Sequence, residues 1–460
     1  MTVMSASENA KSSRADMMLN MPVHRVIPRM AIPTIISMLI TSIYNMADTF
    51  FVSQIGTSAS GAVGVIFSAM AIIQAIAFTF AMGCGTNVSQ ALGAGDEERA
   101  GRFAAVGFFT AFAVGIVITI LGISNIDWLV RFLGATETIA PYAIDYATYI
   151  FYAAPFIMCS FVMNSLLRFE GLAAFGMVGI TSGGILNMVL DPILIFGFNL
   201  GTAGAAIATA ISQFVSFCIL LAMTTLRPEA ISIRLKHFKP SAPIYGRILY
   251  NGFPSLGRQG IASVATIILN TAAGVYGDAA IAAMSIVSRF VMFINSTVIG
   301  FGQGFQPVCG FSYGAGKYAR VREAYWFCVK VSTVILLVLG STAMLFSESI
   351  VTIFRRDDLE VIRIGTLALR LQLCTLPLWG FIVMSNMLTQ SIGYGARATL
   401  LSISRQGLFL IPVLLTFPRL FGLTGIQCAQ PVSDVCAFGL AAYIMSGVLR
   451  ELKNTPDKAA

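Results

Sequence analysis

Residues 30–48 read MAIPTIISMLITSIYNMAD and form the first long apolar stretch of the chain. No charged residue occurs between Met30 and Ala47, and after Asp48 none occurs until Asp96. A stretch of this length and apolarity predicts a helix that spans a membrane. An ionised carboxylate inside such a helix costs about 2.5–3.5 kcal/mol on insertion scales, so we expect Asp48 to have a function.

The composition of the whole chain is typical of a polytopic membrane protein. Of its 460 residues, 57% are hydrophobic and 11% are charged, and the mean hydropathy is +0.81. Soluble domains carry about 25% charged residues. The net charge of +8 does not indicate nucleic acid binding, because basic residues of membrane proteins concentrate in cytoplasmic loops. The eight cysteines have no metal-ligand spacing and are expected to be packing residues.

Twelve apolar segments follow one another along the chain, and each predicts a transmembrane helix. The expected fold class is therefore an all-α polytopic membrane protein with twelve spans. The segments cover roughly residues 28–54, 61–92, 101–124, 139–168, 174–197, 202–225, 246–275, 279–311, 321–346, 361–392, 398–418 and 422–449.

Basic residues orient these spans. An even number of spans puts both termini on one side of the membrane. If that side is the cytoplasm, nineteen Lys and Arg residues lie on it and five lie on the other, which predicts cytoplasmic termini. The expected division is a cytoplasmic tail at 1–27, an N-terminal lobe at 28–226, a cytoplasmic linker at 227–245, a C-terminal lobe at 246–449 and a second tail at 450–460.

The two halves of the chain repeat each other at a constant offset of 221 residues. Repeated Gly and Pro residues mark close backbone approaches and kinks. Two parallel repeats of six spans predict two pseudo-symmetric six-helix bundles with a cleft between them, which favours a carrier. The matching pairs include Pro33 and Pro254, Gly56 and Gly277, Gly83 and Gly304, Gly93 and Gly314, Gly95 and Gly316, and Arg99 and Arg320.

Two acids within the spans carry the expected chemistry. Tyr44 and Asp48 are four residues apart, as are Asn187 and Asp191, so each pair shares a helix face. Pro192 cannot donate a backbone hydrogen bond, which leaves a carbonyl oxygen free one turn before Asp191. These oxygens suit Na⁺ at Asp48 and Asp191, or a proton carried on the same carboxyl groups. The alternative is that both acids only fix helix packing through hydrogen bonds.

The second half of the chain has different polar residues within its predicted membrane spans. The two acids correspond there to Leu269 and Pro412. Arg405 and Asp434 occur instead, and they predict a buried ion pair that locks the C-terminal bundle, with a transport role as the alternative.

No catalytic motif accompanies these residues. His24 and His237 have no nearby nucleophile or ligand cluster, and the Gly-rich stretch at 310–318 does not fit a phosphate loop. Arg258 and Arg289 either face the cleft or extend toward a membrane interface. We expect no enzyme activity and no cofactor other than a coupling ion, H⁺ or Na⁺.

Short motifs spread along the chain carry a family resemblance. They are Pro33, ADTFFV at 47–52, GAG at 93–95, LDP at 190–192 and YGAG at 313–316. Together they resemble the multidrug and toxic compound extrusion (MATE) family. The stretch GQGFQP at 302–307 is similar to the MepA/DinF-like bacterial branch of that family.

The resemblance implies an antiporter of the bacterial inner membrane that exports amphipathic, often cationic compounds by alternating access. It implies drug-like small molecules and the lipid bilayer as partners, with no nucleic acid and no obligate protein partner. It also implies conformational hinges at Pro33 and Pro192. The implied cation site consists of Asp48, Asn187, Asp191 and Thr209, with Tyr44 and Asn164 nearby.

The chain departs from the NorM-like branch of the same family. Two acids of that branch are replaced here by Ala262 and by polar residues such as Gln390, so no cation site is expected in the second bundle. A flippase of lipid-linked saccharide precursors from the same superfamily is the alternative function and would favour a basic central cavity. A channel and a membrane enzyme are further alternatives.

Overall fold

The computed structural model describes residues 12–226, 230–231, 233–354 and 358–458. Within these ranges the chain forms helices and no strand, which confirms the all-α fold class. Part of the expected N-terminal tail and of the linker lies outside the described residues, as do Lys11, Arg227, Arg355 and Arg356 from the charge count.

The helices of the two halves follow the same order. The first half contains α2 (Val23–Ser53), α3 (Thr57–Gly93), α4 (Glu97–Ser124), α5 (Ile126–Phe132), α6 (Ala140–Phe169), α7 (Ala173–Pro192), η1 (Ile193–Gly197) and α8 (Gly201–Leu226). A short η2 (Leu235–His237) precedes the second half. That half contains α9 (Ala242–Gly274), α10 (Asp278–Gly314), α11 (Tyr318–Leu345), α12 (Ser347–Phe354), α13 (Leu359–Ser391), α14 (Gly395–Ile403), η3 (Ser404–Leu410), α15 (Ile411–Phe421) and α16 (Leu423–Asn454).

A long helix occupies each of the twelve expected spans, and within the described residues eleven of them are also apolar enough to be recognised as membrane-spanning by composition. The expected seventh span, α9, is 33 residues long but does not qualify. It carries Asn251, Arg258, Gln259 and Asn270, which lower its hydropathy. Because α9 packs along α3, it is a twelfth long helix shielded by its neighbour.

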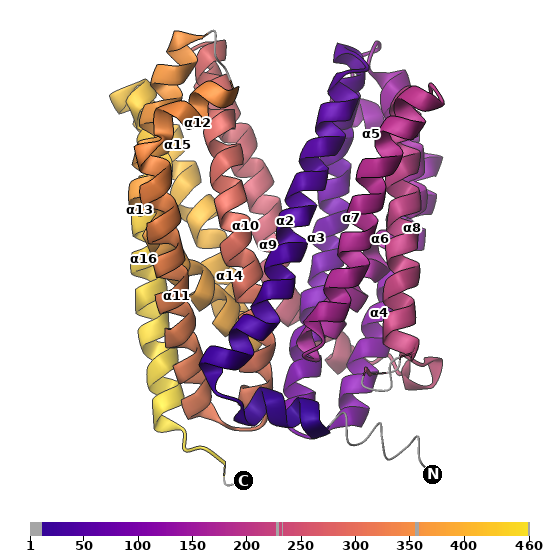
Figure 1. Ribbon diagram of the computed structural model, residues 1–460, viewed down its shortest axis with the longest axis vertical. Coiled ribbons are helices and arrows are strands. Elements are labelled where there is room, and N and C mark those ends of the chain that lie inside the picture. Colours follow the sequence, from indigo (N-terminus) through magenta and orange to yellow (C-terminus); the bar gives the residue numbers. More distant parts are fainter. Residues whose placement is uncertain (1–11, 227–229, 232, 355–357, 459–460) are drawn as a thin grey trace.

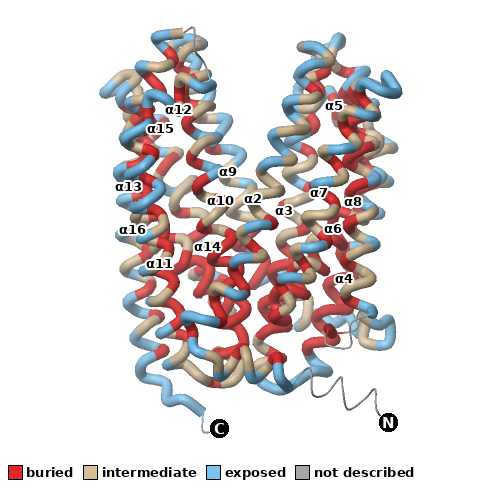
Figure 2. Tube along the Cα trace, in the orientation of Figure 1, coloured by how far each residue is buried: buried red, intermediate tan, exposed pale blue. Residues whose placement is uncertain are grey.

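The helices form two groups that correspond to the two halves of the sequence (Figure 1). The groups meet near the end that carries both termini and spread apart at the other end. Helix α2 packs against α10, and α3 packs against α9. Buried residues concentrate toward the joined end (Figure 2).

Repeated glycines lie where the two groups meet. A Cβ atom on Gly93 would lie 2.1 Å from the carbonyl oxygen of Phe311, and one on Gly314 would lie 2.1 Å from that of Gln90. These two contacts are related by the 221-residue offset. Gly83 makes a similar approach, because its Cβ would lie 2.0 Å from the carbonyl oxygen of Ile248. The repeat therefore encodes a pseudo-symmetric seam between the two bundles.

The seam predicts opposite effects for two substitutions in α3. Gly83→Ala places a methyl group against the backbone of α9, and we expect a loss of about 1–3 kcal/mol from overpacking. Gly64→Ala has open space around its new Cβ, and we expect a gain of about 0.5–1 kcal/mol from helix propensity. Unfolding temperatures of the purified variants measure both effects. Equal shifts in the two variants would contradict the close approach at Gly83.

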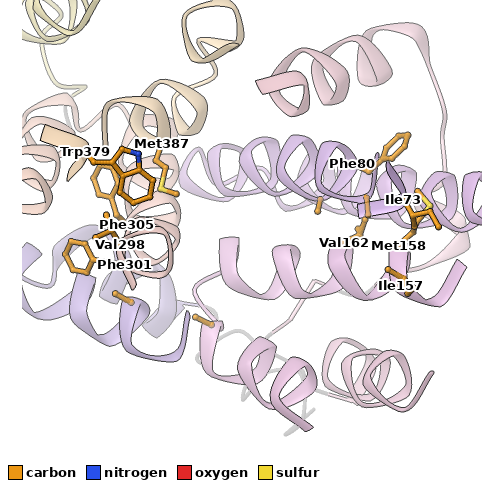
Figure 3. Close-up of a cluster of buried hydrophobic side chains, with 14 of the residues drawn as sticks. Ile73, Phe80, Ile157, Met158, Val162, Val298, Phe301, Phe305, Trp379 and Met387 are labelled. Atoms are coloured by element: carbon orange, nitrogen blue, oxygen red, sulfur yellow. The ribbon is translucent and has the colours of Figure 1, made fainter. Parts of the chain in front are cut away.

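Apolar side chains fill the interior of both bundles. Figure 3 shows two separate groups of buried side chains, one on α3 and α6 and the other on α10 and α13. The first group includes Ile73, Phe80, Ile157, Met158 and Val162, and the second includes Val298, Phe301, Phe305, Trp379 and Met387. Both groups belong to one apolar core that continues from the first bundle into the second.

Candidate functional site

Three of the expected site residues meet inside the first bundle. Asp191 is fully buried on α7, and Asn187 lies one turn before it. The side-chain amide of Asn187 donates to Asp191 Oδ1 at 3.2 Å and to Thr209 Oγ1 of α8 at 3.3 Å. Helix α8 packs along α7, which brings Thr209 to this position.

Helix α2 brings the second acid to the same place. Asp48 is half-buried, and its charge interacts with that of Asp191. Tyr44 lies one turn before Asp48 and interacts with it as well. The ring of Tyr44 packs on α7 at Gly184, where an added Cβ would lie 3.2 Å from Tyr44 Cδ1. The small residue at 184 therefore allows α2 to approach α7 closely.

Tyr146 of α6 is a site residue that the sequence did not identify. It is 1% exposed and interacts with Asp48, Asp191, Tyr44 and Thr209. It therefore joins the polar groups of four helices. The signal for it in the sequence is weak, because a tyrosine in an apolar span is also typical of ordinary packing.

Several oxygens of this cluster have no hydrogen-bond partner among the described residues. They are Asp48 Oδ1, Asn187 Oδ1 and Asp191 Oδ2, and all three atoms are buried. Buried polar atoms are normally paired, because an unpaired one loses its hydration without compensation. Three unpaired acceptors in one cluster, two of them on carboxyl groups, form an arrangement suited to a cation or a proton.

A small pocket adjoins the cluster. It is lined by polar and apolar side chains of α2, α3, α6 and α8, and it shares Tyr44 and Thr209 with the cluster. Gln74 and Gln213 add two further polar groups to its wall. The acids are thus next to a space that is bordered by both amide and aromatic groups.

The helix that carries Asp191 changes its winding directly after Pro192. Helix α7 ends at Pro192, and the next five residues form the π-helical turn η1. Proline removes one backbone N–H from the helical ladder, which explains why the hydrogen-bond pattern changes at this point. The irregular turn lies beside the buried acid.

Asn164 does not join the cluster. Its side chain packs at the start of α7, where an added Cβ on Gly176 would lie 2.9 Å from Asn164 Nδ2. Asn164 and Tyr146 are 18 residues apart on α6, which corresponds to about 27 Å along a helix at 1.5 Å per residue. The expectation that Asn164 lies near the cation site is wrong for this arrangement of the helices.

Pro33 lies inside α2, which continues as one helix from Val23 to Ser53. Next to it, Thr34 Oγ1 donates to the carbonyl oxygen of Gly300 in α10 at 2.6 Å. Between Ser37 and Val52, no residue of α2 is fully buried. Further along α2, Ser42 Oγ lies 3.1 Å from Ser296 Oγ of α10, so hydrogen bonds to the second bundle continue as far as Ser42.

The expected polar pair of the second bundle is formed. Arg405 Nε donates to Asp434 Oδ1 at 2.6 Å, and Asp434 also accepts from Gln430 at 2.9 Å and from Thr375 at 3.0 Å. The guanidinium of Arg405 lies over the ring of Trp379, 5.1 Å from its centroid. Asp434 is 2% exposed. In contrast to the first bundle, the acid here has its own cation.

Other polar groups cross the seam between the bundles. Arg168, at the end of α6 and counted among the basic residues of the cytoplasmic side, is 3% exposed. It donates to the carbonyl oxygen of Gln303 and to Gln306 Oε1 of α10, both at 3.3 Å. Gln306 donates to Gln390, which in turn donates to Ser255 Oγ at 3.1 Å. Arg258 is partly buried within electrostatic reach of Arg168, and Arg289 is exposed.

Comparison with known proteins identifies the family. The MatE family model matches residues 33–193 and 254–416, two stretches that begin 221 residues apart. The multidrug export protein MepA of Staphylococcus haemolyticus is 28% identical over 432 residues, which cover 94% of this chain and 94% of that protein. The MepA protein of Staphylococcus aureus strain NCTC 8325 is 27% identical and covers 94% and 95% of the two chains.

Solved structures agree with this assignment. A crystal structure of MATE in complex with MaL6 gives a TM-score of 0.91 at 28% identity, covering 96% of this chain and 99% of that one. An outward-facing multidrug resistance MATE family transporter gives a TM-score of 0.90 at 28% identity, covering 95% and 98%. Proteins of this family are transporters that need no cofactor, so the chain is not an enzyme, as predicted. With the family model matching both halves, the chain belongs to the MatE family of membrane transporters.

Proposed function

We propose that this protein is a multidrug efflux antiporter that exchanges amphipathic, often cationic compounds for H⁺ or Na⁺. The relatives named as multidrug export proteins span nearly the whole chain and support the export of drug-like molecules. The cluster around Asp48 and Asp191 supports coupling to a cation. A bacterial cytoplasmic membrane is the proposed location, in keeping with the bacterial relatives.

The three unpaired buried oxygens carry this proposal. Asn187 uses its amide N–H groups on Asp191 and Thr209, so that its own carbonyl oxygen and Asp191 Oδ2 remain as acceptors. Asp48 Oδ1 adds a third acceptor from α2. A fixed packing role would leave these atoms paired, as they are around Asp434. A site that a cation enters and leaves needs acceptors that the protein itself does not satisfy.

The halves of α2 support an alternating-access mechanism. The first part is bonded to α10 through Thr34, and the later part brings Asp48 to α7. Pro33 lies directly before Thr34, so a change of bend at Pro33 would shift the contacts of Thr34 and Ser42 with α10 together with Asp48. In the proposed cycle, a cation at the acids neutralises them and changes the bend at Pro33, and substrate leaves while the cation is bound. Pro192 would allow a matching adjustment of α7 beside Asp191.

The proposed topology keeps both termini in the cytoplasm, so the joined end of the bundles faces inward and the open end faces outward. The basic residues near the termini favour this orientation. The domain division remains as expected from the sequence, with two lobes at 28–226 and 246–449 joined by a linker at 227–245. The N-terminal tail of that division contains a helix at 12–20.

A flippase of lipid-linked saccharides has less support. Such a protein would favour a basic central cavity for anionic headgroups. Of the three candidate arginines, Arg405 is neutralised by Asp434, and Arg289 is exposed. Of these three, Arg258 alone is left near the seam, where it lies within electrostatic reach of Arg168.

Transport in proteoliposomes with separate gradients tests the coupling. We expect substrate to move against its gradient when a pH gradient or a Na⁺ gradient is imposed, because the cluster binds one of these cations. Substrate flux that follows neither gradient would contradict antiport. Flux of fluorescent lipid instead of ethidium would support the flippase.

A further inference from the structure

Three arginines surround a pocket at the end of the molecule that carries both termini. The pocket lies between the start of α4 and the start of α9, and it is lined by Arg99, Arg102, Phe103, Ser241, Pro243 and Arg247. It has a volume of about 250 Å³ and is open to solvent on one side, which leaves room for a phosphate group. It is far from the acid cluster, which lies in the other half of the spans.

Most of the positive charge in this pocket has no partner. Within the described residues, the guanidinium groups of Arg99 and Arg247 make no hydrogen bond or ion pair, and Arg99 only lies over the ring of Phe103 at 5.8 Å. Arg102 pairs with Glu98 through its terminal amino group, and its Nε has no hydrogen-bond partner. Lys239 lies within electrostatic reach of Glu98 and adds a further cation.

The acids beside the pocket are engaged elsewhere. Asp96 accepts from the backbone N–H of Arg99 at 2.9 Å and thereby caps α4, and Glu98 is held by Arg102. The first turn of α9 adds a weak positive potential to that of the arginines. Glu97, in the first turn of α4, is engaged as well. Four basic residues, Arg99, Arg102, Lys239 and Arg247, thus outnumber the three acids at the start of α4, and the net positive charge favours an anion.

The repeat supplies an internal comparison. At the 221-residue offset, Arg320 corresponds to Arg99, and the start of α2 corresponds to the start of α9. In that copy the guanidinium of Arg320 donates to the carbonyl oxygens of Met18 at 3.0 Å and Met21 at 2.6 Å. Lys317 beside it donates to Asn20 Oδ1 at 2.7 Å. The N-terminal segment thus supplies the oxygen acceptors in the second copy.

The first copy has the same arginine but no such acceptors in the described residues. Phosphate oxygens would take their place, because arginine binds phosphate through several charge-assisted hydrogen bonds. The exposed side chains of Tyr250 and Phe253 follow Arg247 along α9 at three-residue spacing. They offer an exposed apolar surface on α9 to an acyl chain.

We propose that Arg99, Arg102 and Arg247 form a binding site for a phosphate group, which an anionic phospholipid of the adjacent leaflet would supply. Because Arg99 and Arg102 belong to the first bundle and Arg247 to the second, the bound phosphate joins the two bundles at the closed end. The site would then stabilise the conformation described here.

The test compares thermal unfolding of the purified protein with phosphatidylglycerol, phosphatidylcholine or inorganic phosphate. We expect phosphatidylglycerol to raise the unfolding temperature of the wild type. The double variant Arg99→Gln/Arg247→Gln should bind it roughly 25-fold more weakly, at about fivefold per arginine. The control Arg25→Gln/Arg450→Gln removes two exposed arginines from the same end and should respond as the wild type does.

Each arm decides part of the proposal. Stabilisation by phosphatidylglycerol that is lost only in the pocket variant supports the lipid as the source. Stabilisation by inorganic phosphate that is lost in the same variant supports the site with a soluble source. Equal responses of the wild type, the pocket variant and the control would overturn the proposal. The unfolding temperatures without added ligand show whether both variants are folded.

Discussion

Replacing Asp48 or Asp191 by Asn is expected to abolish drug efflux while the protein remains folded. Each substitution keeps the size of the side chain but removes the charge that binds or releases the coupling cation. Folding should not suffer, because a neutral amide costs less than a carboxylate at this depth. Ethidium efflux from cells at equal expression measures the loss, and unfolding temperature measures folding.

Asp127→Asn is the matched control. Asp127 is an exposed acid in α5, at the same open end of the molecule, and its side chain makes no hydrogen bond or ion pair with the residues that the structure describes. Its amide variant should transport at the wild-type rate. Wild-type efflux in both Asp48→Asn and Asp191→Asn would contradict the proposed coupling site, whatever the control does.

The helices and their repeat could be predicted because both are visible in the order of the residues. A span is an apolar run within one segment, and the repeat is a comparison of the two halves of the chain. Apolar runs of about 20 residues report membrane spans directly. The 221-residue offset of Gly93 and Gly314 is visible without knowledge of the fold, and the seam explains it. Helix α9 lies where the sequence predicted it. Its polar residues Arg258 and Gln259 lower its hydropathy, and only the neighbouring helices, which a hydropathy value does not include, explain how it fits among the spans.

The cluster around Asp191 was only partly predictable. Spacing within one helix correctly paired Asn187 with Asp191, because residues four apart share a face. Tyr146 and Asn164 lie on one helix, and only the packing of α6 against α7 decides which of them reaches the acids. The family resemblance matched only the residue type at position 164, and a residue type does not show which of the two side chains reaches the acids. The same holds for Arg168, whose partners lie on the other bundle.

Arg405→Met is expected to destabilise the protein by about 3–5 kcal/mol, because it leaves the buried carboxylate of Asp434 without its cation. The remaining bonds from Thr375 and Gln430 do not neutralise the charge. The double variant Arg405→Met/Asp434→Leu removes both charges and should recover most of this stability, since apolar replacements of buried ion pairs are often neutral. Unfolding temperatures of the three proteins measure this recovery.

The double variant also separates the two roles considered for this pair. If Arg405 and Asp434 only hold α16 against η3, a stable double variant should still transport ethidium. A double variant that folds as well as the wild type but does not transport would assign the pair to the transport cycle. The contrast with the first bundle favours the structural role. Both carboxylate oxygens of Asp434 accept hydrogen bonds, whereas Asp48 Oδ1 and Asp191 Oδ2 have no hydrogen-bond partner among the described residues.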